Sequence, residues 1–311
     1  DPRLLLRRDG SRAARTAGMV LTLAVGLGSF VAIHVWGASM MAPFLPSPTF
    51  PDVIVSLLPR GVGGDAAGRA AALEGVADGR CLAIEAVQRD LDEAVVARMT
   101  EVSGRPPAFR NVLLFGVAPR EAFGGERPLA PFRFTAGERQ RAAAALARGD
   151  ACLITRMFAR QSGLGIGGTV ALAPRGGAAG EAFTVAGVVD LNWHLVTSRA
   201  NLRGRGGMPQ ATLGPVFVSE AAARRVSGNA GTTFFLWANL SPAYRALGPL
   251  PAGQRLESEI REALRIDAGN TVRVHHRDEI ADGTLAHGAR LIGALARIPF
   301  WSLVVLATGI A

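Results

Sequence analysis

The sequence has 311 residues, of which 49% are hydrophobic and 19% are charged, with a mean hydropathy of +0.24. Its net charge is +9, and all 34 basic residues are arginine. Because there is no lysine, a P-loop ATPase, Schiff-base chemistry and the S-x-x-K nucleophile pair are excluded. The low charged fraction favours membrane segments, and the scattered arginines, without a basic stripe, argue against nucleic-acid binding.

The N-terminal segment has the pattern of a membrane-spanning helix. Residues 1–15 carry five arginines, residues 16–37 carry no Asp, Glu or Arg, and the uncharged stretch continues to Pro51. A helix of 22 residues is about 33 Å long, enough to cross a hydrocarbon core of about 30 Å. The positive-inside rule places residues 1–15 in the cytoplasm and residues 38–297 outside.

A cleaved signal peptide is the alternative for residues 16–37. The apolar run is longer than a signal h-region, and the A-S-M and M-A-P triplets that follow are weak cleavage sites, so a retained helix is favoured. His34 lies near the outer end of this helix and is interpreted as an interfacial histidine rather than as a ligand.

Residues 38–277 are too many for a simple loop and predict an extracytoplasmic domain. Its first part predicts a strand at 52–59, a helix at 65–76, a strand at 80–87, a helix at 90–102 and a strand at 111–117. Asp90 and Glu93 have the spacing of a capping box, and so do Thr135 and Glu138, which would open a helix running through Ala147.

The rest of the domain alternates between strands and short helices. The pattern predicts strands at 151–155, 169–172, 182–189, 215–218, 232–240 and 271–275, and helices at 157–162, 220–226 and 254–265. The Gly/Arg-rich residues 199–209 are interpreted as a surface loop rather than an anion site. Two β-α-β units bracket the domain, which predicts an α+β fold with a split β-α-β subdomain near the membrane and an inserted β-rich subdomain further out.

The C-terminal part is expected to return to the membrane. Residues 278–297 predict a pre-membrane helix, and residues 298–311 are apolar and uncharged but too few to span. They are interpreted as the start of a second transmembrane helix, with Pro299 near its beginning, so the sequence is expected to be a piece of a longer polypeptide.

The two cysteines, Cys81 and Cys152, form no CxxC motif, which makes a zinc site improbable. In an exported domain they could pair, and because each lies in an apolar run, two buried free thiols are at least as well supported.

Residues 162–173 contain G-x-G-x-x-G at Gly163, Gly165 and Gly168. A dinucleotide site needs a strand before the glycines and a helix after them. Here the predicted order is reversed, so Gly163 is interpreted as a helix C-cap, and Gly167 and Gly168 as a turn before a strand.

No catalytic constellation is recognised, and the sequence predicts no catalytic, cofactor-binding or metal-binding residues and no enzyme activity. His275 and His276, beside Asp278 and Glu279, are interpreted as a solvated strand end, because adjacent strand residues point to opposite faces. His194, beside Trp193 and Asp190, has no nucleophile in reach by sequence.

An ordered set of segments resembles the FtsX/MacB type of ABC transporter permease. These segments are LAVGLGSF at 23–30, NVLLFGVAPREAF at 111–123, residues 149–172, FTVAGVVD at 183–190, FFLWANL at 234–240, TVRVHHRDEI at 271–280 and LATGIA at 306–311. The resemblance covers essentially the whole chain but rests on diffuse hydrophobic motifs. It departs from the family where Gly167-Gly168 replaces a common Gly-Asp.

The resemblance implies a multi-pass protein of the inner or plasma membrane, with a MacB-like periplasmic core domain. It implies a cytoplasmic ABC ATPase as partner, a homo- or heterodimer of permeases, the lipid bilayer as surroundings, and no nucleic acid. ATP hydrolysis would drive movement of the outer domain for export, lipoprotein release or cell-envelope work.

Two other readings are possible. A sensor or receptor with two transmembrane helices and an extracytoplasmic ligand-binding domain has the same plan. The prolines at 43, 46, 48 and 51 break the chain just outside the first helix, which favours the permease. A secreted binding domain would require that there be no second membrane helix.

Overall fold

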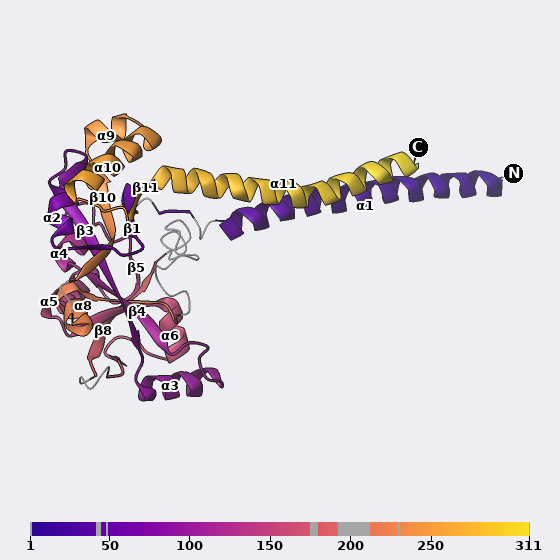
Figure 1. Ribbon diagram of the computed structural model, residues 1–311. Helices are drawn as coiled ribbons and strands as arrows, with labels where there is room; N and C mark the ends of the chain where they lie inside the picture. Colours follow the sequence, from indigo (N-terminus) through magenta and orange to yellow (C-terminus); the bar gives the residue numbers. More distant parts are fainter. Residues whose placement is uncertain are drawn as a thin grey trace. The chain divides into compact units, whose positions relative to one another are not determined.

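The computed structural model describes residues 2–41, 45–47, 49–174, 180–191, 212–228 and 231–310. The chain divides into two compact units, which are described separately. One, the helical unit, contains residues 1–45 and 281–311. The other, the outer unit, contains residues 46–280 (Figure 1).

The helical unit consists of α1 (Pro2–Met41) and most of α11 (Arg277–Ile310). Within the described residues, one helical segment, Thr16–Met41, is long and apolar enough to cross a membrane, with a mean hydropathy of 2.0. The two helices approach closely at two glycines. A Cβ atom on Gly37 would overlap Ile292 Cγ1, and one on Gly288 would lie 2.7 Å from Met41 Cγ, so a side chain at either position would require Ile292 or Met41 to shift.

Both helices are longer than the sequence predicted. The helix expected at 16–37 is part of one that begins at Pro2, and the segments expected at 278–297 and from 298 form one continuous helix that includes Pro299. Hydropathy marks where the surroundings of a helix change, whereas arginine, alanine and leucine all favour the helical backbone, so a change in polarity does not end a helix.

The outer unit is built on one mixed sheet with the strand order β11-β1-β10-β3-β4-β9-β6-β8-β5; β2 pairs with β10, and β7 with β8. We call its first half the first lobe. It contains β1 (Val53–Leu58), β2 (Val62–Gly63), α2 (Ala66–Ala71), β3 (Val76–Asp90), β10 (Thr232–Leu240), α9 (Pro242–Ala246), α10 (Pro249–Ala263) and β11 (Thr271–His276).

The first lobe contains the two predicted β-α-β units, and they are interleaved. β1 and β3 are parallel with β10 between them, while β10 and β11 are parallel with β1 between them. Each unit is therefore split by a strand of the other, as in ferredoxin-like folds. The α+β class and the split subdomain are confirmed.

We call residues 91–231 the inserted lobe, because they interrupt the first lobe between β3 and β10. Its elements are α3 (Glu93–Ser103), β4 (Asn111–Val117), α4 (Pro119–Phe123), β5 (Arg133–Ala136), α5 (Arg139–Arg148), β6 (Ala151–Thr155), α6 (Arg156–Ser162), β7 (Thr169–Ala171), β8 (Ala182–Asp190), β9 (Pro215–Ser219) and α8 (Glu220–Ser227). β3 belongs to both lobes, since Glu85 pairs with Thr233 of β10 on one side and Gly116 of β4 on the other.

Both faces of the sheet in the first lobe are buried. On one face, Val55 and Leu236 pack with side chains of α2, α9 and α10. On the other, Ile54 and Trp237 belong to a cluster that includes Leu129 and other residues of the inserted lobe. The inserted lobe has a further core around Phe158 and Val216. Figure 1 shows α9 and α10 at one end of the outer unit and α3 at the other.

Both predicted capping boxes are wrong. Asp90 still belongs to β3, and it is Asp92 whose side chain accepts from Ala94 N at the start of α3. Thr135 lies in β5 and donates its hydroxyl hydrogen bond to Val188 O, while Glu138 precedes α5 without a side-chain cap. A capping box is recognised from local spacing alone. Asp90 and Thr135 instead belong to strands that pair with residues further along the chain.

Candidate functional site

The points where the chain enters and leaves the outer unit lie side by side. β1 pairs with β11 so that Val53 is opposite His276. Asp52 precedes Val53 and Arg277 follows His276, and the N–H of Arg277 donates to Asp52 O at 2.8 Å. The segment following α1 and the first residue of α11 are therefore joined at the same corner of the sheet.

Asp52 lies at the centre of this corner, and its side chain is 3% exposed. Its Oδ1 accepts from Arg127 Nη2 at 2.9 Å and lies 3.5 Å from Arg277 Nη1, and its Oδ2 accepts from Leu240 N at 3.0 Å. The N–H of Asp52 donates to Asn239 Oδ1 at 3.3 Å. A buried carboxylate is costly without partners, and here both oxygens have them.

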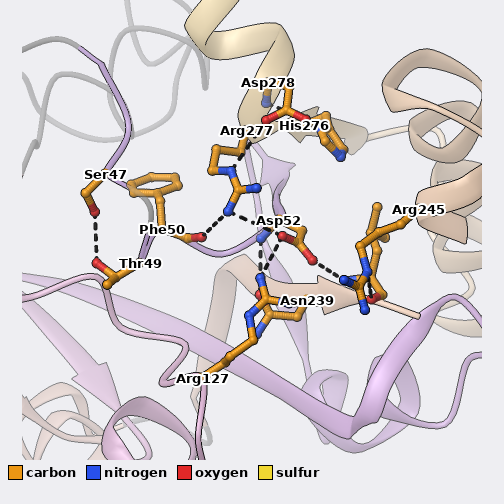
Figure 2. Close-up of polar contacts among 11 residues, drawn as sticks. Ser47, Thr49, Phe50, Asp52, Arg127, Asn239, Arg245, His276, Arg277 and Asp278 are labelled. Carbon is orange, nitrogen blue, oxygen red and sulfur yellow. Dashed lines mark hydrogen bonds and ion pairs between the residues drawn. The ribbon is translucent and has the colours of Figure 1, made fainter. Parts of the chain in front are cut away.

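The two arginines come from different parts of the fold. Figure 2 shows them approaching Asp52 from opposite sides. Arg277 is the first residue of α11, and its Nη1 also donates to Phe50 O at 3.2 Å. Arg127 belongs to the inserted lobe, in the segment between α4 and β5. We call Asp52, Arg127, Asn239 and Arg277 the Asp52 junction; through one carboxylate it connects α11 with both lobes.

His276 adjoins this junction and corrects a prediction. The pair His275-His276 was expected at a solvated strand end, but His276 is 6% exposed. Its Nδ1 accepts from Asp278 N at 3.1 Å and lies 3.7 Å from Asp278 Oδ2. The reason is that α11 begins directly after β11, so the first turn of the helix contacts the last strand residue, which the strand pattern alone does not reveal.

A second buried carboxylate lies where β3 passes between the lobes. Glu85 Oε1 accepts from Arg224 Nε at 2.9 Å and from Arg224 Nη2 at 2.6 Å, which connects β3 with α8. This hydrogen bond raises the pKa of the Arg224 guanidinium. Glu220, one turn earlier in α8, has a raised pKa, mainly because burial disfavours its charged form.

The glycine-rich stretch is not arranged as a dinucleotide site. Gly163 ends α6 in the left-handed conformation with φ 64°, and Gly167 has φ 81° in the turn before β7, which pairs antiparallel with β8. The element that follows the glycines is the strand β7, whereas a dinucleotide site needs a helix at that place. The predicted C-cap and turn are confirmed.

Cys81 and Cys152 are free and buried. They belong to different core clusters, one in β3 and the other in β6. Burial raises the pKa of the Cys81 thiol to about 12 and also raises that of Cys152. The sequence allowed either a disulfide or two buried free thiols, and the structure has two buried free thiols.

The remaining candidates divide into described and undescribed residues. The ring Nδ1 of His34 bonds within its own helix, to Phe30 O at 2.9 Å. His194, Trp193 and residues 199–209 lie outside the described residues. Asp190 forms ion pairs with Arg133 and Arg156. Within the described part of the chain, no group of three or more His, Cys, Asp or Glu side chains has a metal-binding arrangement.

The comparisons with known proteins give structural similarities only. No family model and no curated protein matches the chain. The periplasmic region of MacB from Actinobacillus actinomycetemcomitans is 8% identical with a TM-score of 0.45, covering 75% of this chain and 92% of that one. The extracellular domain of the noncanonic ABC-type transporter YknZ from Gram-positive bacteria is 11% identical with a TM-score of 0.42, covering 70% and 98%.

Proposed function

We propose that the chain belongs to a membrane permease subunit of an ABC-type system of the FtsX/MacB class. In this proposal the Asp52 junction transmits displacement of α11 to the outer unit. The observation that carries this transmitting role is that the carboxylate of Asp52 contacts both Arg277, the first residue of α11, and Arg127 of the inserted lobe. The permease class is supported by the ordered segments that resemble the family and by the uncharged residues 16–51.

The charge pattern along the chain supports a membrane location for α1. Residues 16–51 contain no Asp, Glu or Arg, and Asp52 is the first charged residue after Arg15. An uncharged helix can stay in hydrocarbon, whereas the buried charges of the Asp52 junction require a folded, polar surrounding. Ten residues separate the end of α1 at Met41 from the buried charge of Asp52.

The contacts at Asp52 are suited to transmitting force. Packed interiors and paired charges change between discrete arrangements rather than deforming continuously. A displacement of Arg277 along α11 would either break its ion pair with Asp52 or move the whole corner of the sheet, including Asn239 and Arg127. If the ion pair holds, both lobes move together with α11.

ATP hydrolysis would take place in a partner, because the chain has no lysine for a P-loop. The expected partners are a cytoplasmic ABC ATPase and a second permease subunit. Movement of the outer unit would then serve export, lipoprotein release or cell-envelope work.

The proposal is tested by membrane topology together with partner capture. A reporter enzyme fused after Gly149 is expected to be active outside the cytoplasm, and the tagged chain in native membranes is expected to co-purify with an ABC ATPase. Reporter activity in the cytoplasm would contradict the topology. If the reporter is active outside the cytoplasm but the chain co-purifies with a histidine kinase or another signalling protein and with no ATPase, the receptor hypothesis is favoured instead.

A further inference from the structure

The inserted lobe has an open groove of about 540 Å³ beside α3 and α6. One wall is formed by α3, one by α6, and the rest by the segment between α3 and β4 and by two residues before β9. Its lining includes Met99, Arg105, Phe109, Met157, Gln161 and Thr212.

The apolar side chains of this groove are exposed in a way that those of the cores are not. Met157 is 56% exposed and Phe109 is 42% exposed, while Met99, at 2%, joins the groove to the core beneath it. Methionine side chains adapt to partners of different shape, and aromatic and methionine residues are enriched in interfaces. Clustered apolar exposure of this kind marks an interaction surface.

The charge around the groove is positive. Arg105 lines it, and Arg160, next to the lining residue Gln161, is exposed on α6. None of the lining residues is acidic. Glu101 is the exposed acidic residue closest in sequence to the lining residues of α3, and because it is two positions from both Met99 and Ser103, it does not share their face of the helix.

We propose that this groove binds an acidic amphipathic helix of a partner protein. Apolar side chains of that helix would lie between Met99 and Met157, and its carboxylates would face Arg105 and Arg160. Helix-in-groove recognition needs an apolar groove with a charged rim, and charge complementarity selects the partner. The amide of Gln161 and the hydroxyl of Thr212 would form hydrogen bonds with the helix at the edge of the groove.

A protein segment fits these features better than a lipid or a nucleic acid. The groove is open to solvent, whereas an acyl chain is held by an enclosed apolar cavity. The single aromatic ring among the lining residues offers no series of stacking surfaces for bases. Binding in this groove does not require the ATPase partner, so it can be measured on the chain alone.

The test uses two synthetic peptides with the same leucine face. One carries glutamate and the other lysine on the polar face, and both carry a fluorescent label. Binding is measured by fluorescence anisotropy to the full chain in phosphatidylcholine nanodiscs. The glutamate peptide is expected to bind, at least about tenfold more tightly than the lysine peptide, and more weakly at high salt.

Variants locate the binding. Met157→Glu and, separately, Arg105→Glu are each expected to weaken binding of the glutamate peptide by about tenfold, since a few anchor residues dominate such interfaces. The matched control is Leu250→Glu, which alters an exposed leucine (60%) of the first lobe and should leave affinity unchanged. Both mutated groove residues are exposed, and circular dichroism checks that each variant is folded.

Four outcomes would overturn the proposal. These are no binding of the glutamate peptide, equal affinity for both peptides, the same affinity in Met157→Glu as in the unaltered chain, or the loss of a dimer in Met157→Glu by sedimentation, which would make the groove a contact between two copies. Binding of a fluorescent fatty acid that Met157→Glu abolishes would assign the groove to lipid instead.

Discussion

Arg127 Nη2 lies 2.9 Å from Asp52 Oδ1, and this bond connects the inserted lobe to the corner of the sheet where α11 begins. Asp52 is almost fully buried, whereas Arg127 is 46% exposed. Breaking this bond therefore destabilises Asp52 more than Arg127. Water can solvate the exposed guanidinium, whereas the buried carboxylate would be left without a replacement partner.

Replacing Arg127 by alanine is expected to lower the free energy of unfolding by about 1–2 kcal/mol, since it takes one charged partner from buried Asp52 while solvent screens the other side of the pair. Arg133→Ala is the matched control, because Arg133 pairs with the more exposed Asp190, and a change below about 1 kcal/mol is expected there. Chemical denaturation in nanodiscs measures both. Equal losses in the two variants would contradict the account.

Glu220 gives a prediction for pH. Burial raises its pKa in the folded state, so the protonated form is favoured by folding. The stabilising contribution is complete below the unfolded pKa, about 4.3, and is lost as the pH rises through the raised folded value. Glu220→Gln is therefore expected to be more stable than the unaltered chain at pH 7.

The same comparison below pH 4 supplies the control. There both chains carry an uncharged side chain at position 220, so their denaturation midpoints should converge. A Glu220→Gln variant that is less stable at pH 7 would show that the ion pair with Arg224 at 3.6 Å outweighs burial.

Cys81 and Cys152 are expected to resist alkylation in the folded chain. Burial hinders the reagent, and the raised pKa values leave almost no thiolate, which is the reactive form. Mass spectrometry after iodoacetamide treatment at pH 8 should count no labels in the native chain and two after denaturation without reductant. A single label, or none, after denaturation would indicate a disulfide or another modification.

The close contact at Gly37 predicts how α1 and α11 tolerate substitution. Gly37→Val would bring a side chain against Ile292, whereas a Cβ on Gly28 meets no atom within 4 Å. Gly37→Val is expected to lower the midpoint of thermal unfolding of the helices, followed by circular dichroism in nanodiscs, and Gly28→Val is expected to leave it unchanged. Equal midpoints would argue against this packing of the helices.

The sequence predicted the two-lobe plan because the strands and helices of both lobes have recognisable local sequence patterns. Buried strands such as β1, β6 and β10 are short apolar runs, and their alternation with helices bracketed the domain. Short elements without such runs, namely β2, β5, α4 and α9, were not predicted. β3 is longer than predicted because its C-terminal half leaves β10 and pairs with β4.

The Asp52 junction could not be derived from the sequence, because it depends on the pairing of β1 with β11. Asp52 was read as the first residue of a strand, and Arg127 and Arg277 were not singled out. One signal was present: Asp52 is the first charged residue after the uncharged stretch 16–51. Its partners, however, lie far along the chain and are brought to it only by the strand register Val53 to His276.

The central claim, that Asp52 transmits movement of α11 to the inserted lobe, is tested most directly by hydrogen exchange. The full permease with its ATPase is compared with and without a non-hydrolysable ATP analogue, in the unaltered protein and in Asp52→Asn. The analogue is expected to change amide protection both at the start of α11 and in residues 124–132, which include Arg127.

In Asp52→Asn, the change at the start of α11 should persist and the change in residues 124–132 should disappear, while β9 stays equally protected in both proteins as a control for folding. An undiminished nucleotide-dependent change in residues 124–132 of the Asp52→Asn protein would contradict the account.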